Sequence, residues 1–276
     1  MTISVFVIAL QDSTRFPFLE SDLKRERLVF TKVNAVNGKL LGEDEISKLV
    51  NLGICKSRLG YAISRPLIGC ALSHRKVYEL SLRQSSEWTL IFEEDVRLKH
   101  GFAHSLLKLN LENLDKHPVV IQLFTRGERF ISRKEQRKLE NGSTIFEFST
   151  IPGQAAAYLI NRRAVELALK SVKIDGPSDW PNWASSVKFF GVFPFLVSES
   201  GEGTTIGSKS VSKFRYRLRV IAVLTGIHLI TNRWRYDSTS SYWKLIAKPL
   251  AARILWQIKG RKTYPRDEKT GLWVLR

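Results

Sequence analysis

The sequence predicts an α/β fold in which a mainly parallel sheet is flanked by helices. Short apolar runs rich in β-branched residues recur along the first two thirds of the chain, and amphipathic, helix-like segments separate them. This alternation is typical of parallel strands joined by helices. Ligands of such sheets bind at the carboxyl ends of the strands, so functional residues are expected where apolar runs end in polar ones.

Several apolar runs have the length and composition of buried strands. The first, residues 3–10, is continuously apolar, which is typical of a strand covered on both faces. Another, residues 88–92, runs directly into three acids. The expected strands are residues 3–10, 28–36, 88–92, 119–124, 144–148, 155–160 and 188–200.

Helix signals occupy the intervals between these runs. Residues 42–53 carry acids in the first turn and end at Gly53, and residues 65–84 have Pro66 where a first helical turn tolerates proline. Asn161 is a plausible N-cap for the helix that follows it. Further helices are expected just before Leu28 and over residues 102–114.

Composition is that of a globular protein with an uneven positive charge. The chain has 276 residues, 43% of them hydrophobic and 25% charged, with a formal net charge of +18. Residues 213–276 hold 15 basic and three acidic side chains, which leaves +12 in this segment. We therefore expect a catalytic-type domain over residues 1–210 and a basic, amphipathic, helical tail over residues 211–276.

The sequence gives no sign of a disulfide framework, a zinc pattern, a signal peptide or a membrane-spanning helix. The two cysteines, Cys55 and Cys70, form no disulfide framework or zinc pattern, which fits a reducing compartment. His100 and His104 are four residues apart, so they could share a helix face and bind a metal ion. No carboxylate pattern accompanies them, which disfavours that role. The first residues lack a basic region and a cleavage-like site, and no apolar run reaches the length of a membrane span, so neither a signal peptide nor a spanning helix is expected.

Three acids close the run at residues 88–92. Strand alternation places Glu93 and Asp95 on one side of the strand and Glu94 on the other. Converging carboxylates repel each other, so a positive group between them or a retained proton is expected. Hard cations such as Mn²⁺ and Mg²⁺ bind carboxylates together with phosphates, whereas a solvated acidic turn is the alternative.

The helix segment Gly69-Cys70-Ala71-Leu72-Ser73-His74, followed by a strand ending in Glu93-Glu94-Asp95, resembles the family 25 glycosyltransferases of lipopolysaccharide and lipooligosaccharide synthesis. Residues 5–15, 34–38 and 156–166 add to the resemblance, which spans about residues 1–210. It implies a GT-A-like, Rossmann-type catalytic domain.

The resemblance also implies site residues. Asp95, with help from Glu93 or Glu94, would engage a Mn²⁺ or Mg²⁺ bound to the donor diphosphate. The first strand, ending near Ala9, and its following loop would hold the nucleoside, and Arg15 would meet a phosphate or face solvent. Asn34 and the helix residues Gly69, Ser73 and His74 complete the expected donor site, although His74 is equally well explained as a structural histidine.

Some positions depart from the family pattern. The family usually has Asn at Ala9, Asp at Asn34 and Asn37, Glu at Leu67, and Asp at Glu94. Asparagine keeps an acceptor and loses a charge, so contacts at 34 and 37 are expected in weaker form. Leu67 removes an acid outright.

The loop at residues 173–184 offers a general base. Asp179 matches a Pro-x-Asp-like element of the family, with Asp175 in reserve, and a helix cap is the alternative role of Asp179. Trp180 and Trp183 would form an acceptor platform or pack in the core.

A second loop, at residues 198–210, is rich in glycine and serine. It resembles a late Ser-x-Ile element of the family, in which Thr205 would contact the donor as the loop closes. A plain linker into the tail is the alternative.

These features favour an inverting, metal-dependent glycosyltransferase that transfers a hexose, with galactose from UDP-galactose in β linkage as the leading choice, to a lipid-linked oligosaccharide. The basic, aromatic tail indicates contact with an anionic membrane surface, or two helices packed on the core. The expected location is the cytoplasmic face of the bacterial inner membrane. A nucleic-acid-binding protein without catalytic activity is the alternative that the charge suggests, but no nucleic-acid-binding motif supports it. A glycosidase is disfavoured because its two catalytic carboxylates lie on opposite sides of the glycosidic bond, whereas the acids at 93–95 are adjacent in the sequence.

Overall fold

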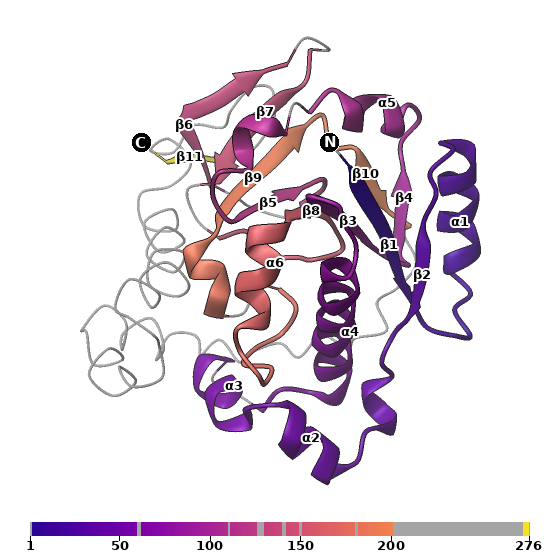
Figure 1. Ribbon diagram of the computed structural model, residues 1–276, viewed down its shortest axis with the longest axis vertical. Helices are drawn as coiled ribbons and strands as arrows, with labels where there is room; N and C mark the ends of the chain where they lie inside the picture. The colour runs from indigo at the N-terminus through magenta and orange to yellow at the C-terminus, as the bar shows by residue number, and fades with distance from the viewer. Residues whose placement is uncertain are drawn as a thin grey trace.

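A computed structural model describes residues 2–59, 62–109, 111–125, 130–139, 142–148, 151–179, 182–200 and 273–275. Its centre is a nine-stranded sheet with the strand order β11-β6-β7-β9-β5-β8-β3-β1-β2 (Figure 1). The strands are β1 (Ile3–Ala9), β2 (Thr31–Asn34), β3 (Trp88–Glu93), β5 (Val119–Gln122), β6 (Phe130–Lys138), β7 (Thr144–Phe148), β8 (Ala157–Asn161), β9 (Lys188–Phe193) and β11 (Trp273–Leu275).

Most strands of this sheet run in one direction. Antiparallel pairing of β8 with β3 and β5, and of β7 with β6 and β9, shows that β7 and β8 run opposite to the rest. A separate antiparallel pair joins β4 (Val96–Leu98) to β10 (Val197–Glu199). The predicted α/β fold with a mainly parallel, helix-flanked sheet is thus confirmed.

Helices cover both faces of the sheet. The described helices are α1 (Phe16–Arg25), α2 (Glu43–Leu49), α3 (Leu52–Leu59), α4 (Arg65–Leu82), α5 (Phe102–Leu107) and α6 (Arg162–Leu169). Helices α4 and α6 lie side by side across one face, and α1 lies beyond the other (Figure 1). None of these helices is long and apolar enough to cross a membrane.

The alternation of β1 explains the two cores. Val5 and Val7 pack with α1 and α5, whereas Phe6 and Ile8 pack with α4 and α6. A continuous apolar strand is therefore buried on both sides, as its sequence predicts. Ile91 of β3 belongs to the same core as Phe6 and Ile8 and packs with α4. This contact helps to position the helix over the end of β3.

Some local expectations are wrong. Gly53 does not end a helix, because α2 stops at Leu49 and α3 runs through Gly53. Val50 between them forms a parallel bridge with Ile174, which interrupts the helical run. His100 precedes α5, whose N-cap is Gly101, so His100 and His104 do not share a face of that helix.

One local expectation is confirmed. Asn161 caps α6 as predicted, accepting a hydrogen bond from the Ala164 amide.

The domain boundary at residue 210 and the predicted basic tail lie outside the described residues. The exception is β11, near the end of the chain, which pairs in parallel with β6 and adds to the main sheet.

Candidate functional site

The carboxyl ends of three adjacent strands lie beside one cleft. In register, Ala9 of β1 pairs with Asn34 of β2, and Ile8 pairs with Glu93 of β3, so the three strand ends are level. The cleft has a volume of about 350 Å³ and is called the strand-end cleft below. Its lining residues are Ile8, Ala9, Leu10, Asp12, Arg15, Ala35, Val36, Asn37, Gly38, Lys39, Pro66, Cys70, Ser73, Glu93, Glu94 and Asp95.

Two acids of the triplet, Glu94 and Asp95, contact an arginine, and the triplet does not alternate along a strand. Strand β3 ends at Glu93, and Glu94 and Asp95 form the turn before β4, so the predicted alternation stops there. Arg15, at the N-terminus of α1, places Nη2 2.5 Å from Oε1 of Glu94 and Nη1 3.7 Å from Oδ2 of Asp95. The positive group expected between the carboxylates is thus at least partly Arg15.

Glu94 also accepts a hydrogen bond from the backbone. Its second oxygen, Oε2, accepts a hydrogen bond of 2.9 Å from the Leu10 amide, just after β1. Glu94 and Arg15 are both buried, so the expectation that Arg15 faces solvent is wrong. This pair fixes the loop after β1 to the turn after β3.

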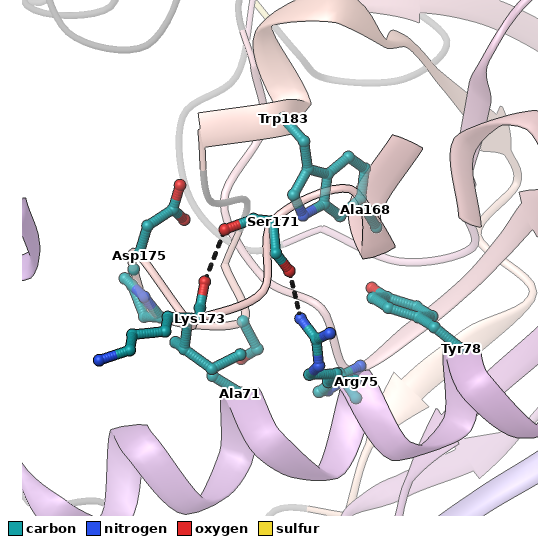
Figure 2. Close-up of a pocket in the computed structure, with 13 residues that line it drawn as sticks. Ala71, Arg75, Tyr78, Ala168, Ser171, Lys173, Asp175 and Trp183 are labelled. Atoms are coloured by element: carbon teal, nitrogen blue, oxygen red, sulfur yellow. Dashed lines mark hydrogen bonds between the residues drawn. The ribbon is translucent and has the colours of Figure 1, made fainter. Parts of the chain in front are cut away.

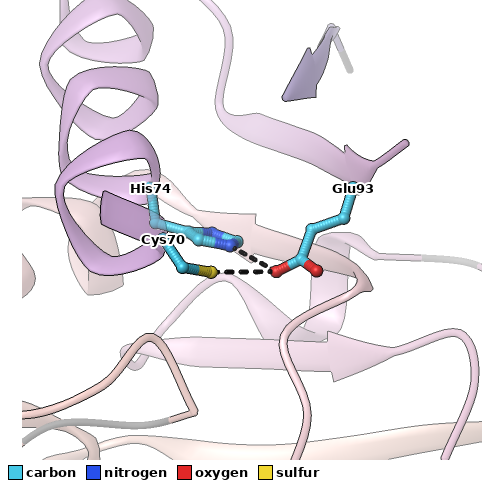
Figure 3. Close-up of side chains that lie close together, drawn as sticks. All are labelled: Cys70, His74 and Glu93. Carbon is cyan, nitrogen blue, oxygen red and sulfur yellow. Dashed lines mark hydrogen bonds and ion pairs between the residues drawn. The ribbon is translucent and has the colours of Figure 1, made fainter. Parts of the chain in front are cut away.

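Glu93 turns toward helix α4. Its Oε1 lies 2.9 Å from Nε2 of His74 and accepts a hydrogen bond of 3.4 Å from the thiol of Cys70 (Figure 3). Burial raises the pKa of Glu93, but the hydrogen bond with His74 leads a set of contacts that bring it below its ordinary value. Burial, followed by the charge of Glu93, raises the pKa of the Cys70 thiol well above its ordinary value.

His74 continues into a buried chain of polar groups. Its Nδ1 lies 2.8 Å from the hydroxyl of Tyr158 on β8, which lies 2.8 Å from the hydroxyl of Tyr78 on α4. Burial raises the pKa of both tyrosines, so they stay neutral over the physiological range. These hydrogen-bonded groups hold the imidazole ring of His74 in one orientation.

Helix α4 meets the loop after β2 without space between the backbones. A Cβ placed on Gly69 would lie 2.4 Å from the carbonyl oxygen of Val36 and 2.5 Å from the amide nitrogen of Gly38. Ser73, one turn later, accepts a hydrogen bond of 2.8 Å from the Val36 amide and donates one of 2.7 Å to the Gly69 carbonyl. The helix thereby positions one wall of the strand-end cleft.

These contacts place the sequence-predicted donor residues. Ala9, Arg15, Ser73, Glu93, Glu94 and Asp95 line the strand-end cleft. Gly69 and His74 do not line it and instead contact residues that do. Asn34 is exposed and is not a lining residue, whereas Asn37, three residues later, is one.

Several cleft residues were not among the predicted site residues, and Asp12 and Lys39 are the charged ones. Asp12 follows β1, and Asn37 and Lys39 follow β2, where the Asn37 side chain accepts a hydrogen bond from the Lys39 amide. The sequence signal that could have identified these residues as part of a ligand site is their position in the loops that follow predicted strands.

A smaller hollow of about 30 Å³ lies between α4 and the loop after α6 (Figure 2). Asp175 and Trp183 line it, and Trp183 packs edge-on against Tyr78 at a centroid distance of 6.1 Å. Trp183 is thus partly a packing residue, as one of its predicted alternatives holds. Asp179 is exposed and close enough to Cys70 for its charge to raise the pKa of that thiol. Trp180 and Thr205 lie outside the described residues.

Comparison with known proteins decides the family. A model of glycosyltransferase family 25, described as an LPS biosynthesis protein, matches residues 2–179. The chain belongs to this family.

Two proteins similar in sequence to this chain come from Homo sapiens and Haemophilus influenzae. Procollagen galactosyltransferase 2 of Homo sapiens is 34% identical over 110 residues, which are 38% of this chain and 17% of that protein. A putative glycosyltransferase of Haemophilus influenzae is 24% identical over 169 residues, covering 61% of this chain and 57% of that protein. The chain therefore spans about a sixth of the human relative and somewhat over half of the bacterial one.

One solved structure among those that resemble this family 25 chain is a glycosyltransferase involved in glycosylation of the major capsid of PBCV-1. It is 10% identical, covers 60% of this chain and 64% of that chain, and has a TM-score of 0.30, which is too low to support an argument.

Asp95 is the carboxylate of this family 25 member that best fits a hard divalent cation. Its side chain lines the strand-end cleft, is 22% exposed and lies 3.7 Å from Arg15, a looser contact than the 2.5 Å between Arg15 and Glu94 or the 2.9 Å between His74 and Glu93. Mn²⁺ and Mg²⁺ need one or two protein carboxylates when phosphate oxygens and water supply the other ligands. The oxygen donors at this edge of the sheet fit such an ion.

Proposed function

We propose that the chain is an inverting, metal-dependent glycosyltransferase that passes a hexose from a nucleotide sugar to the oligosaccharide of lipooligosaccharide or lipopolysaccharide. The observation that carries the proposal is the strand-end cleft, where an acidic turn and two strand-following loops converge in a family 25 chain. This is the position at which α/β sheets bind nucleotides.

The donor would lie along the strand-end cleft. The ends of β1 and β2, with Asn37 and Lys39, would face the nucleoside and its first phosphate, because these groups supply a hydrogen-bonding amide and a positive charge. Asp95 would hold a Mn²⁺ or Mg²⁺, and Glu93 would assist through Oε2, because its Oε1 faces Cys70 and His74. When bound, such a cation neutralises the diphosphate and stabilises it as a leaving group.

The acceptor would approach from the side of Asp179. An exposed carboxylate can reach an incoming hydroxyl, and an inverting transfer needs one base to remove that proton. Asp175 is the second candidate, and Trp180 with Trp183 would contact the acceptor sugar. Galactose is the proposed hexose because a relative is named a procollagen galactosyltransferase.

A membrane-associated acceptor would explain the charge distribution. Residues 213–276 carry a net charge of +12, which would hold the protein reversibly on an anionic bilayer. We place it on the cytoplasmic face of the bacterial inner membrane. Flotation with vesicles containing anionic lipid, run beside a DNA gel shift at physiological salt, separates this proposal from nucleic-acid binding.

The decisive experiment screens nucleotide sugars with and without Mn²⁺ for donor hydrolysis and transfer. UDP-galactose should support turnover only with the cation, and Asp95→Asn should abolish it while the circular dichroism spectrum stays unchanged. Asp44→Asn, an exposed acid in the first turn of α2, is the matched control and should retain activity. Normal turnover by Asp95→Asn in excess Mn²⁺ would refute the cation assignment.

A further inference from the structure

Three different metal-binding side chains meet beneath the strand-end cleft. Cys70 and His74 are four residues apart on α4 and so lie on one face of the helix, opposite Glu93 at the end of β3 (Figure 3). The ligand atoms of these three side chains all lie within 4.8 Å of one another. Among the described residues, this is the one such group found.

Two of the three separations are close to those between neighbouring ligands of a tetrahedral ion. The Cys70 Sγ to Glu93 Oε1 distance is 3.4 Å, and the His74 Nε2 to Glu93 Oε1 distance is 2.9 Å. Tetrahedral Zn²⁺ with ordinary bond lengths requires about 3.6 Å and about 3.4 Å between such pairs of atoms. A shift of roughly half an ångström in the imidazole or the carboxylate would therefore admit the ion.

The donor set selects a different class of metal from that at Asp95. Thiolate and imidazole favour Zn²⁺ and similar borderline-soft ions, whereas Mn²⁺ and Mg²⁺ favour carboxylate and phosphate oxygens. Cys70 and His74 supply two soft or borderline ligands, and the Asp95 side of the cleft supplies oxygens. The two ions would thus be distinguished by chemistry even though the sites adjoin.

Neighbouring groups already orient the ligands. The Tyr158 hydroxyl lies 2.8 Å from Nδ1 of His74 and can accept a hydrogen bond from Nδ1–H, which leaves the lone pair of Nε2 to bind the ion. The Ser178 hydroxyl lies 3.1 Å from the Cys70 sulfur. Outer contacts of this kind are typical of zinc ligands.

We propose that Cys70, His74 and Glu93 form a binding site for Zn²⁺ or a chemically similar divalent ion, separate from the cation at Asp95. The bound ion would join α4 to the end of β3, and through Ser178 it would steady the loop that carries Asp179. The thiol loses its proton to the solvent on coordination, as metal-binding thiols do. The proposal stands without the proposed sugar transfer.

Cobalt is the probe for the test, because Co²⁺ takes the place of Zn²⁺ and shows a near-ultraviolet charge-transfer band when sulfur coordinates it. The full chain contains two cysteines, so such a band must come from Cys55 or Cys70. Chelator-treated protein is titrated with Co²⁺ and then with Zn²⁺. We expect one equivalent of the sulfur-to-cobalt band and its complete loss on Zn²⁺ addition.

Two cysteine variants assign the band. Cys70→Ser should remove it, whereas Cys55→Ala, at a buried cysteine outside the cluster, should retain it. Cys70→Ala gives the same comparison if serine prevents folding. Zn²⁺ should also raise the melting temperature of the natural chain and of Cys55→Ala, but of neither Cys70 variant.

Two results would overturn the proposal. Folded natural protein without a sulfur-to-cobalt band would mean that the three side chains form a hydrogen-bonded cluster only, and a band that survives Cys70→Ser would place the metal elsewhere. Mn²⁺-dependent donor hydrolysis, measured on the same preparation, reports separately on the proposed enzyme activity. Failure of one proposal is therefore distinguishable from failure of the other.

Discussion

Arg15 and Glu94 form a buried ion pair at the base of the strand-end cleft, with 2.5 Å between Nη2 and Oε1. The pair joins the start of α1 to the turn after β3, two segments far apart in the sequence. Because both side chains are about one-tenth exposed, each depends on the other for its charge to be tolerated.

Arg15→Gln should therefore be strongly destabilising. It leaves the Glu94 carboxylate buried without its partner, and such a loss costs about 3–5 kcal/mol in free energy of unfolding. Urea denaturation at pH 7 measures the change. Lys24→Gln, which breaks a largely exposed pair with Glu20, is the control and should cost less than about 1 kcal/mol. Equal effects of the two variants would show that the Arg15 pair is not buried in solution.

Gly69→Ala should separate α4 from the loop after β2. The added Cβ would meet backbone atoms at 2.4 and 2.5 Å, and backbone cannot move aside as a flexible side chain does. We expect a loss of about 1–3 kcal/mol in stability and weaker binding of UDP, because the loop lines the strand-end cleft.

The control for that substitution is Gly53→Ala. The nearest atom to a Cβ there is 3.7 Å away, and alanine is the better helix former. Unfolding and UDP titration of both variants are compared by calorimetry. A Gly69→Ala protein as stable as Gly53→Ala would contradict the close contact.

Asp22 should make stability depend on acid pH. Burial raises the pKa of Asp22, but hydrogen bonds from Arg97 and Arg25 and from the Leu98 amide bring it below its ordinary value of 3.8. A lowered folded-state pKa stabilises the protein above about pH 3.8, and this contribution is lost as the pH falls through the folded-state value.

Asp22→Asn should cost on the order of 3 kcal/mol at pH 7, because charge-assisted hydrogen bonds are lost. The difference from the natural chain should shrink as the pH falls below about 4. Urea midpoints measured from pH 7 to pH 3 test this, with Glu20→Gln on the same helix as a nearly silent control. A difference that does not vary with pH would exclude a charged Asp22.

Asp179→Asn should slow transfer far more than it weakens donor binding. A general base contributes roughly 10²- to 10⁴-fold to the rate, and the exposed Asp179 is proposed to act on the acceptor rather than on the donor. Steady-state turnover and donor titration measure the two quantities. Asp175→Asn is the comparison, and a greater loss of rate there would transfer the role of base to Asp175.

The sequence was sufficient for two of the elements that form the strand-end cleft. The apolar run before Glu93 and the proline-initiated helix around Gly69 both formed as predicted, and their ends lie at the expected edge of the sheet. These features depend on local periodicity and on the general rule for strand ends, which one sequence carries.

Contacts between distant segments were not predictable in this way. Whether Arg15 faces solvent or an acid depends on Glu94, 79 residues later, and no local pattern joins them. The spacing of Cys70 and His74 was visible, but Glu93 joins them only because α4 packs across β3. The reversed direction of β8 is likewise a property of the topology rather than of its residues.

Strand β11 has a practical consequence for anyone who alters the end of the chain. It is the outermost strand of the main sheet and pairs Trp273 with Phe130 and Leu275 with Ser132. Removing the last four residues would uncover the amide and carbonyl groups of β6, and exposed edges of this kind promote self-association. Truncations and affinity tags at the carboxyl terminus should therefore leave β11 intact.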